Sequence, residues 1–287
     1  MLPTYEQIQR AAFFRWQRLG CGHGYDRENW LTGEQELLYA LNYEVAAHYL
    51  LDGTTPRAIG GEGRRVCRFC ELSEPATTFS EDRLALPALV GNRSLFTFEE
   101  CDECHDRFLE GIEAELERFL APLRSEHQSA PATISLPAFK GLAKLALAVM
   151  PRGDLHFFED AIEWVSNPDH DFDSRLFQGL GCYLHLMIYP FPHPWAVLAR
   201  RVDDDAPMPF MLFFLGTSGV VLQAAVPFCV RDEDLEGRPP LVPNVSSPVM
   251  PSPEPLRGPR AFIPLSPEPA RPSRRWRFDS LVNPTLD

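Results

Sequence analysis

The chain has 287 residues and a formal net charge of −13, with 40 acidic against 27 basic side chains. This length is enough for a substantial core and for more than one domain, whereas the acidity argues against a broad nucleic-acid surface, which is usually basic. No run reaches the roughly 18 apolar residues of a membrane-spanning helix, and the N-terminus does not look like a signal peptide, so we expect a cytoplasmic protein that does not associate with membranes.

Residues 1–53 predict a helical hairpin. Thr4 and Gln7 form a capping box, and apolar residues at helical spacing follow as far as the glycine-rich turn 20–25. Asp26 is the expected N-cap of a second helix that continues to Leu50. A DNA-binding helix-turn-helix is the alternative, but the acidity of the second helix argues against it.

The same stretch is similar to a short bacterial domain of unknown function, on the residues IQRAAFFRWQRLGCGHGYDRENWLTGEQEL with their tryptophans and glycine-rich turn. This resemblance implies a helical fold and brings no activity.

Four of the seven cysteines form two pairs with two-residue spacing, Cys67–Cys70 and Cys101–Cys104. Each pair can turn two thiolates toward one ion, and two such knuckles supply the closed tetrahedral set that structural zinc prefers. Redox or disulfide use of the two pairs is the alternative. The remaining cysteines are isolated in sequence, which predicts buried free thiols, and they are Cys21, Cys182 and Cys229.

The 30 residues between the knuckles predict structure of their own. A strand is expected at 77–79, then a loop through Pro87, then a second strand near 91–96. After Cys104 the apolar residues recur at helical spacing, which predicts a helix that begins near His105. The predicted order is knuckle, strand, loop, strand, knuckle, helix.

This order, with CRFC…TFS…LALPALVGNRSLF…EECDECHDRF, resembles the zinc-knuckle branch of the HNH endonuclease family over about 60 residues. The resemblance implies a ββα-metal fold and hydrolysis of phosphodiesters in DNA or RNA, with a histidine as general base and a divalent ion such as Mg²⁺ or Mn²⁺. It assigns catalytic positions to Asn92 and His105. The general-base histidine, three residues before Pro87, is replaced by Leu84, which can neither accept a proton nor bind a metal.

Two functional hypotheses follow from this departure. In the first, the chain is a nuclease whose divalent ion is bound near His105, with a base that the sequence does not identify. In the second, the HNH fold is catalytically degenerate and acts as a binding or regulatory module. For His105 itself, the alternative to metal binding is a solvent-exposed residue at the start of a helix.

Residues 134–232 predict an α+β domain after the zinc-knuckle module 64–126. A strongly apolar helix is expected from Leu136 to Met150, with two lysines on its solvent side, and a second helix from 157 to 165 with Asp154 as its cap. The period then changes to that of antiparallel strands, with residues 216–219 as a hairpin turn. The chain is therefore expected to be an α+β protein, an antiparallel sheet with helices against it.

Residues 233–287 predict a tail. Twelve prolines fall between positions 236 and 272, a composition that cannot offset its ordering entropy by burial and is expected to be extended or disordered. The last residues are cationic and aromatic, with the sequence RRWRF at 274–278. A protein partner bound through this tail is a third hypothesis.

Overall fold

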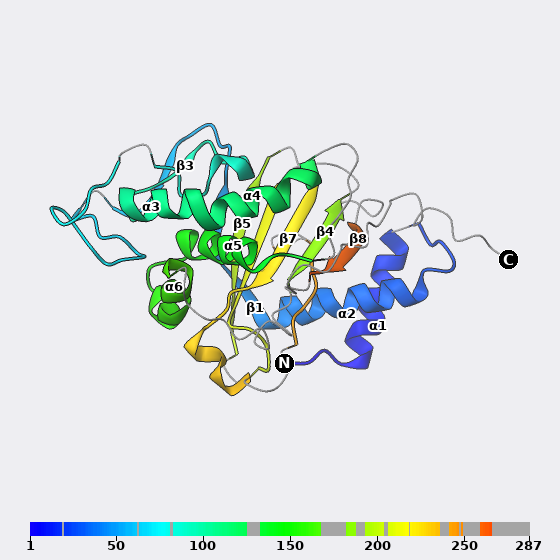
Figure 1. Cartoon of the computed structure of the whole chain (residues 1–287). Coiled ribbons are helices and arrows are strands. Elements are labelled where there is room, and N and C mark those ends of the chain that lie inside the picture. Colours follow the sequence, from blue (N-terminus) through cyan, green and yellow to red (C-terminus); the bar gives the residue numbers. More distant parts are fainter. Residues whose placement is uncertain are drawn as a thin grey trace.

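A six-stranded antiparallel sheet forms the centre of the protein in the computed structural model, with the strand order β1-β5-β6-β7-β4-β8 (Figure 1). The structure describes residues 1–18, 20–61, 63–80, 83–124, 133–167, 182–187, 193–203, 206–217, 219–235, 241–246, 248 and 259–265. The strands are β1 (Tyr43–Leu50), β4 (Tyr183–Met187), β5 (Trp195–Arg201), β6 (Met211–Thr217), β7 (Val220–Ala225) and β8 (Pro259–Pro264). The predicted α+β class is confirmed.

The central strands carry continuous apolar runs because helices or loops cover both of their faces. Every residue of β6 and β7 is buried. Alternate residues contribute to two separate apolar clusters, so that Phe213 faces one side and Phe214 the other. Thr217 pairs with Val220, which confirms the predicted hairpin at this point.

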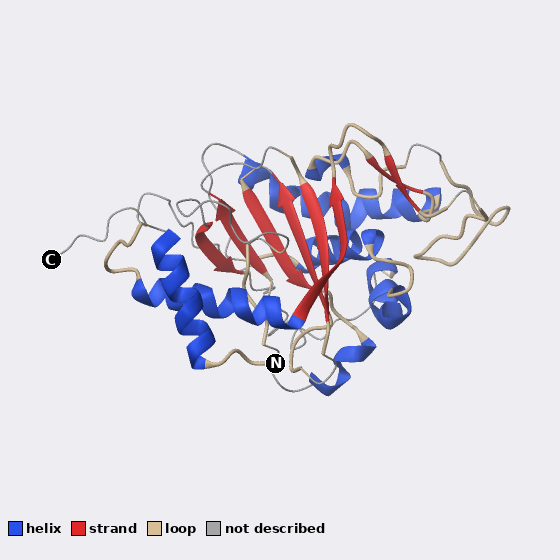
Figure 2. Ribbon diagram, turned by 180° about the vertical axis from the view of Figure 1, so that it is seen from behind, coloured by secondary structure: helices blue, strands red, loops and turns tan. Residues whose placement is uncertain are grey.

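Helices α1 (Tyr5–Arg18) and α2 (Asp26–Asn42) form the predicted N-terminal hairpin, and Figure 2 shows it leading into β1. The capping box is confirmed: Thr4 N–H donates to Gln7 Oε1 at 2.8 Å, and Gln7 N–H donates to Thr4 Oγ1 at 3.3 Å. Asp26 is the first helical residue, not the N-cap, which is Tyr25. The N-terminal part of α2 packs against α1, and its C-terminal part packs on the sheet through Leu38.

The predicted extension of the second helix to Leu50 is wrong. The helix ends at Asn42, and residues from Tyr43 onward form the edge strand β1, which pairs with β5. Tyr, Val and a second Tyr in this stretch favour a pleated, half-buried surface, and pairing with β5 satisfies the backbone groups that a longer helix would have satisfied internally. Sequence spacing alone does not separate the two cases for a short apolar run.

Helix α5 (Leu136–Val149) confirms the predicted apolar helix but is buried all around, from Ala138 to Val149. The expectation that Lys140 and Lys144 face solvent is wrong, because both are buried. One side of α5 shares an apolar cluster with the sheet, and the other side meets a long helical stretch that covers it (Figure 1). That stretch runs through α3 (Asp102–Phe108), the π turn η2 (Leu109–Glu113), α4 (Ala114–Leu120) and the 3-10 turn η3 (Ala121–Arg124).

Helix α6 (Glu159–Ser166) follows the 3-10 turn η4 (Leu155–Phe158) and covers the same side of the sheet as α5. Asp154 is the N-cap residue of η4, whereas that of α6 is Phe158. The carboxylate of Asp154 makes no cap hydrogen bond and instead accepts one from Arg200 Nη1 at 3.0 Å. Two further 3-10 turns are η1 (Ala88–Val90) and η6 (Val230–Leu235).

A second, small sheet lies in the segment that connects β1 to α3. Strand β2 (Arg57–Ile59) pairs in parallel with β3 (Leu95–Thr97), and on the other edge of β3 an antiparallel bridge joins Leu84 to Phe96. The strand expected at 77–79 is wrong, since these residues have no regular structure and the pairing partner of β3 lies at 83–85 instead. Thr78 Oγ1 and the backbone N–H of Ser80 donate to the carboxylate of Asp102, the first residue of α3.

Part of the proline-rich region packs on the sheet. Val242 and Val245 are buried against the same face as α2, and β8 pairs with β4. The rest of the predicted tail, including 274–278, lies outside the described residues.

One apolar cluster includes residues from Leu51 to Leu265. The division of the chain into the domains 1–53, 64–126, 134–232 and 233–287 stays a prediction. No helix in the described ranges is long and apolar enough to cross a membrane.

Candidate metal centre

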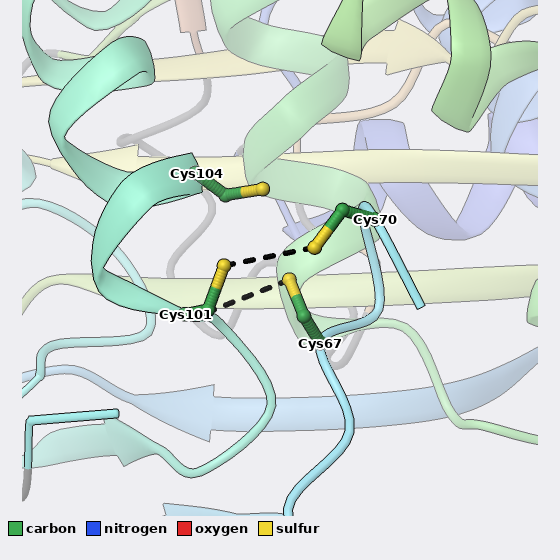
Figure 3. A group of neighbouring side chains, drawn as sticks. All are labelled: Cys67, Cys70, Cys101 and Cys104. Atoms are coloured by element: carbon green, nitrogen blue, oxygen red, sulfur yellow. Dashed lines mark hydrogen bonds between the residues drawn. The ribbon is translucent and has the colours of Figure 1, made fainter. Parts of the chain in front are cut away.

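The sulfur atoms of Cys67, Cys70, Cys101 and Cys104 all lie within 4.8 Å of one another (Figure 3). The first pair lies in a tight turn in which Glu71 N–H donates to Cys67 O, and the second pair spans the first residues of α3. Three of the four side chains are buried, and that of Cys70 is partly exposed. All seven cysteines are described, and none of them forms a disulfide.

The four sulfurs lie close enough together to share one metal ion. Zinc–sulfur bonds of about 2.3 Å imply sulfur–sulfur separations of about 3.8 Å in a tetrahedron. The separation of Cys70 Sγ and Cys101 Sγ is 3.7 Å. The backbone N–H of Cys101 points at Cys67 Sγ from 3.5 Å, the kind of donor that stabilises a thiolate ligand (Figure 3). Soft thiolate sets of this kind suit soft metals, zinc among them.

The thiol groups of the centre differ in acidity. The pKa of Cys67 is lowered to about 5, first by a hydrogen bond with Cys104 and then by the backbone N–H groups of Cys101, Phe69 and Cys70, against the opposing effect of burial. Burial raises the pKa of Cys70 to about 11. Cys67 therefore loses its proton before Cys70, and metal binding would displace the proton that Cys70 still carries.

An arginine supports the second knuckle. Arg107 Nη2 donates to Cys104 Sγ at 3.2 Å. A four-thiolate zinc site carries a formal charge of −2, so a guanidinium on a ligand sulfur offsets part of that charge and orients the ligand. Nothing in the spacing of the motif predicts this contact.

Buried charges surround the centre, and sequence reasoning missed them. Lys144 Nζ lies 2.9 Å from Glu100 Oε2 and 2.7 Å from Glu113 Oε1, and all three side chains are at most 2% exposed. The π turn matters here because it adds a residue to the helical turn after Phe108 and so brings Glu113 to the inner side. Glu113 follows Phe108 by five residues, a spacing that a search for the regular helical period does not detect.

His105 lies beside this cluster. Its Nδ1 is 3.1 Å from Glu100 Oε1, and its side chain is 19% exposed. The structure therefore gives His105 a carboxylate partner instead of leaving it free at the start of the helix. In the described residues the four cysteines are the one group of three or more His, Cys, Asp or Glu ligands that lie together, so no ligand set for Mg²⁺ or Mn²⁺ gathers around His105 there.

Asn92 is buried, and the backbone occupies its side chain. Its Nδ2 donates to Leu86 O and Leu95 O at 2.7 and 2.8 Å, and its Oδ1 accepts from the N–H groups of Ser94 and Leu95. An amide has two donors and one acceptor oxygen, so these bonds use its whole donor capacity. In this position Asn92 holds the loop between the two paired segments in shape.

Leu84 lies in the segment that pairs with β3. Ala85 N–H donates to Leu95 O at 2.9 Å, and Thr97 N–H donates to Arg83 O at 2.8 Å, which places Leu84 opposite Phe96 in an antiparallel pair. The helix α3 begins five residues after β3 ends.

Comparison with known families identifies a match at the N-terminus. Residues 3–38 match a family described as a protein of unknown function (DUF2934). The match covers α1 and most of α2, which confirms the predicted resemblance of the N-terminal hairpin to a domain without assigned activity. No curated protein and no solved structure matches the chain.

Proposed function

We propose that the chain is a zinc protein whose four-cysteine module is a catalytically degenerate relative of the HNH endonucleases and acts as a binding or regulatory module. The observation that carries the proposal is the gathering of four sulfurs, two from each CxxC pair, within 4.8 Å. The zinc ion would be bound by Cys67, Cys70, Cys101 and Cys104 and would have a structural role, because a closed set of four thiolates leaves no position for substrate or water.

The order of elements supports the kinship with HNH proteins. An antiparallel pair formed by 83–85 and β3 precedes α3, and the second knuckle opens that helix. This is the strand, strand, helix order of a ββα-metal unit. The parallel strand β2 is an addition to it.

Three observations support the loss of catalysis. Leu84 stands where the resemblance requires the general base. The side chain of Asn92 makes four hydrogen bonds to backbone groups, so its amide N–H groups are already bonded. Third, apart from the cysteines, no group of three acidic, histidine or cysteine ligands lies together in the described part of the chain.

A retained nuclease activity is the second candidate, and the pairing of His105 with Glu100 favours it. A carboxylate on Nδ1 fixes the imidazole tautomer and leaves Nε2 as the free ring nitrogen, the arrangement of many general bases. The substrate would be a phosphodiester of DNA or RNA, with Mg²⁺ or Mn²⁺ as the second ion. We also propose DNA or RNA as a binding partner. A protein partner would bind through residues 233–287.

Metal analysis and a cleavage assay on the purified chain separate the two candidates. The degenerate module is expected to contain one zinc per chain and to leave plasmid DNA and RNA intact with Mg²⁺ or Mn²⁺. Cleavage that disappears in His105→Ala, with zinc content unchanged, would overturn the degenerate assignment. Gain of cleavage in Leu84→His would show that the missing base alone accounts for the inactivity.

A further inference from the structure

The only two lysines of the chain, Lys140 and Lys144, lie on α5, and both are buried. A buried lysine needs a partner for its charge. Lys140 donates to Asn167 O at 3.0 Å and lies over the Trp164 ring, on the side of α6. Lys144, one helical turn further along the same face, contacts the layer that carries the cysteines instead.

Lys144 attaches the second knuckle to α5. Its partner Glu100 directly precedes Cys101, and its other partner Glu113 comes from the π turn behind the knuckle. Its ammonium group also lies 5.2 Å from the centroid of the Phe108 ring, so an aromatic side chain packs against the buried ion pairs. Charges at this depth are screened little by water.

Arg68 attaches the first knuckle to the same helix. It lies between Cys67 and Cys70 and is buried, and its Nη1 donates to Leu147 O at 2.5 Å and to Met150 O at 3.2 Å. These carbonyls belong to the last turn of α5, where a cation is favoured. Its Nη2 contacts Glu99, the second residue before Cys101.

Each knuckle is therefore fastened to α5 by its own buried cation, and a metal ion would join the two knuckles to each other. The opposite side of α5 packs on the sheet through residues such as Leu145 and Leu142, which share one cluster with Phe213. The helix therefore contacts both the segments that carry the metal centre and the sheet.

We propose that metal occupancy is coupled to the packing of α5, so that the centre regulates the stability of the middle layer of the protein and Lys144, which is no ligand, raises the affinity for zinc. Binding linkage is reciprocal: if zinc stabilises the contacts of α5 with the knuckles, those contacts stabilise bound zinc by the same factor. The proposal rests on the proposed zinc site.

Hydrogen exchange of the full chain, zinc-loaded and after chelation, tests the coupling. Removal of zinc is expected to increase exchange of the α5 amides about tenfold or more, together with that of 64–124. Increased exchange confined to 64–124, with α5 unchanged in a chain that binds one zinc, would overturn the coupling and leave the zinc site intact. Absence of zinc binding would overturn the zinc site and the coupling together.

Competition with a chromophoric chelator tests the reciprocal effect. Lys144→Met is expected to lower zinc affinity about tenfold, and Lys140→Met, the matched change at the lysine that contacts Trp164 and Asn167 O instead of the knuckle carboxylates, to leave it within about twofold. Glu113→Gln, which removes one charge from the cluster without changing its shape, serves if Lys144→Met does not fold and should also weaken zinc binding. Equal affinity in wild type, Lys144→Met and Glu113→Gln would refute the role of the cluster.

Discussion

The two faces of the sheet are closed in different ways. On the α5 face, buried charges in pairs connect the helix to the layer outside it, with Lys144 between Glu100 and Glu113. On the α2 face, neutral groups also make buried polar contacts, such as Tyr43 Oη, which donates to Pro209 O at 2.7 Å, beside the ion pair of the buried Arg201 with Asp232 at the end of β5. The α5 face thus depends on partners that must remain ionised, whereas the α2 face also contains a buried group that must remain neutral, His185.

The layers that lie outside α5 and outside α2 also differ in the buried groups that they contain. The layer over α5 contains the four cysteines. Buried cations connect this layer to the helix, Lys144 from α5 and Arg68 from the first knuckle. The layer over α2 is α1, a helix whose one buried residue is Ile8 and which leaves Phe13 and Phe14 half exposed. Metal removal should therefore act on the α5 face and protonation of His185 on the α2 face, and the following variants test these two effects.

Loss of a cysteine ligand is expected to have the largest effect. Cys101→Ser removes a thiolate from the centre, and the chain should lose its zinc and several kcal/mol of stability, since metal binding at structural zinc sites contributes about 10 kcal/mol or more to folding. Zinc content and the thermal midpoint, with and without chelator, give the measurement. Cys21→Ser changes an exposed thiol outside the cluster and should keep one zinc per chain. A zinc-replete Cys101→Ser protein would contradict the four-cysteine centre.

Acid should act on the α2 face through His185. Its Nε2 lies 3.2 Å from Gln223 Oε1, and burial lowers its pKa to about 4. The folded protein keeps this imidazole neutral, whereas the unfolded chain takes up a proton near pH 6.5. The contribution of His185 is therefore complete above pH 6.5 and is lost as the pH falls toward 4, by up to about 3 kcal/mol.

Urea denaturation of wild type and His185→Gln between pH 7 and pH 4.5 isolates this contribution. Acid effects on the thiolates are common to the two proteins and cancel in the difference. The wild type should lose more stability than the variant as the pH falls. Parallel curves would mean that His185 is protonated in the folded state or that the face opens before it titrates.

Gly141 tests how closely the outer layer approaches α5. A Cβ at this position would lie 2.6 Å from Ile112 O and 3.0 Å from Leu116 Cβ, so Gly141→Ala is expected to cost about 1–3 kcal/mol despite the better helix propensity of alanine. Gly111→Ala, in the π turn with nothing within 4 Å of the new Cβ, should be neutral or stabilising. The two unfolding free energies measure the difference, and equal values would mean that the layers separate readily.

Local signals explain what could be predicted from the sequence. The capping box at Thr4, the apolar helix α5 and the two CxxC pairs each depend on residues close in the chain, and each appears in the structure. The partners of Lys144 lie 31 and 44 residues away, and a spacing rule that assigns a lysine to the solvent side of a helix has no means to find them. Strand β1 was missed because its backbone partner, β5, is separated from it by about 150 residues.

The smallest effect is expected at the hydroxyl group of Tyr43. Tyr43→Phe leaves the ring in place and removes the hydrogen bond to Pro209 O, a loss of about 0.5–1.5 kcal/mol because the carbonyl stays buried without that donor. Tyr25→Phe, at an exposed ring, should be indistinguishable from wild type in the same denaturation experiment. Zinc affinity should be unchanged in both, since Tyr43 lies on the face of the sheet away from α5. A weaker zinc site in Tyr43→Phe would mean that the sheet transmits changes from one face to the other, and the contrast between the two faces would then not hold.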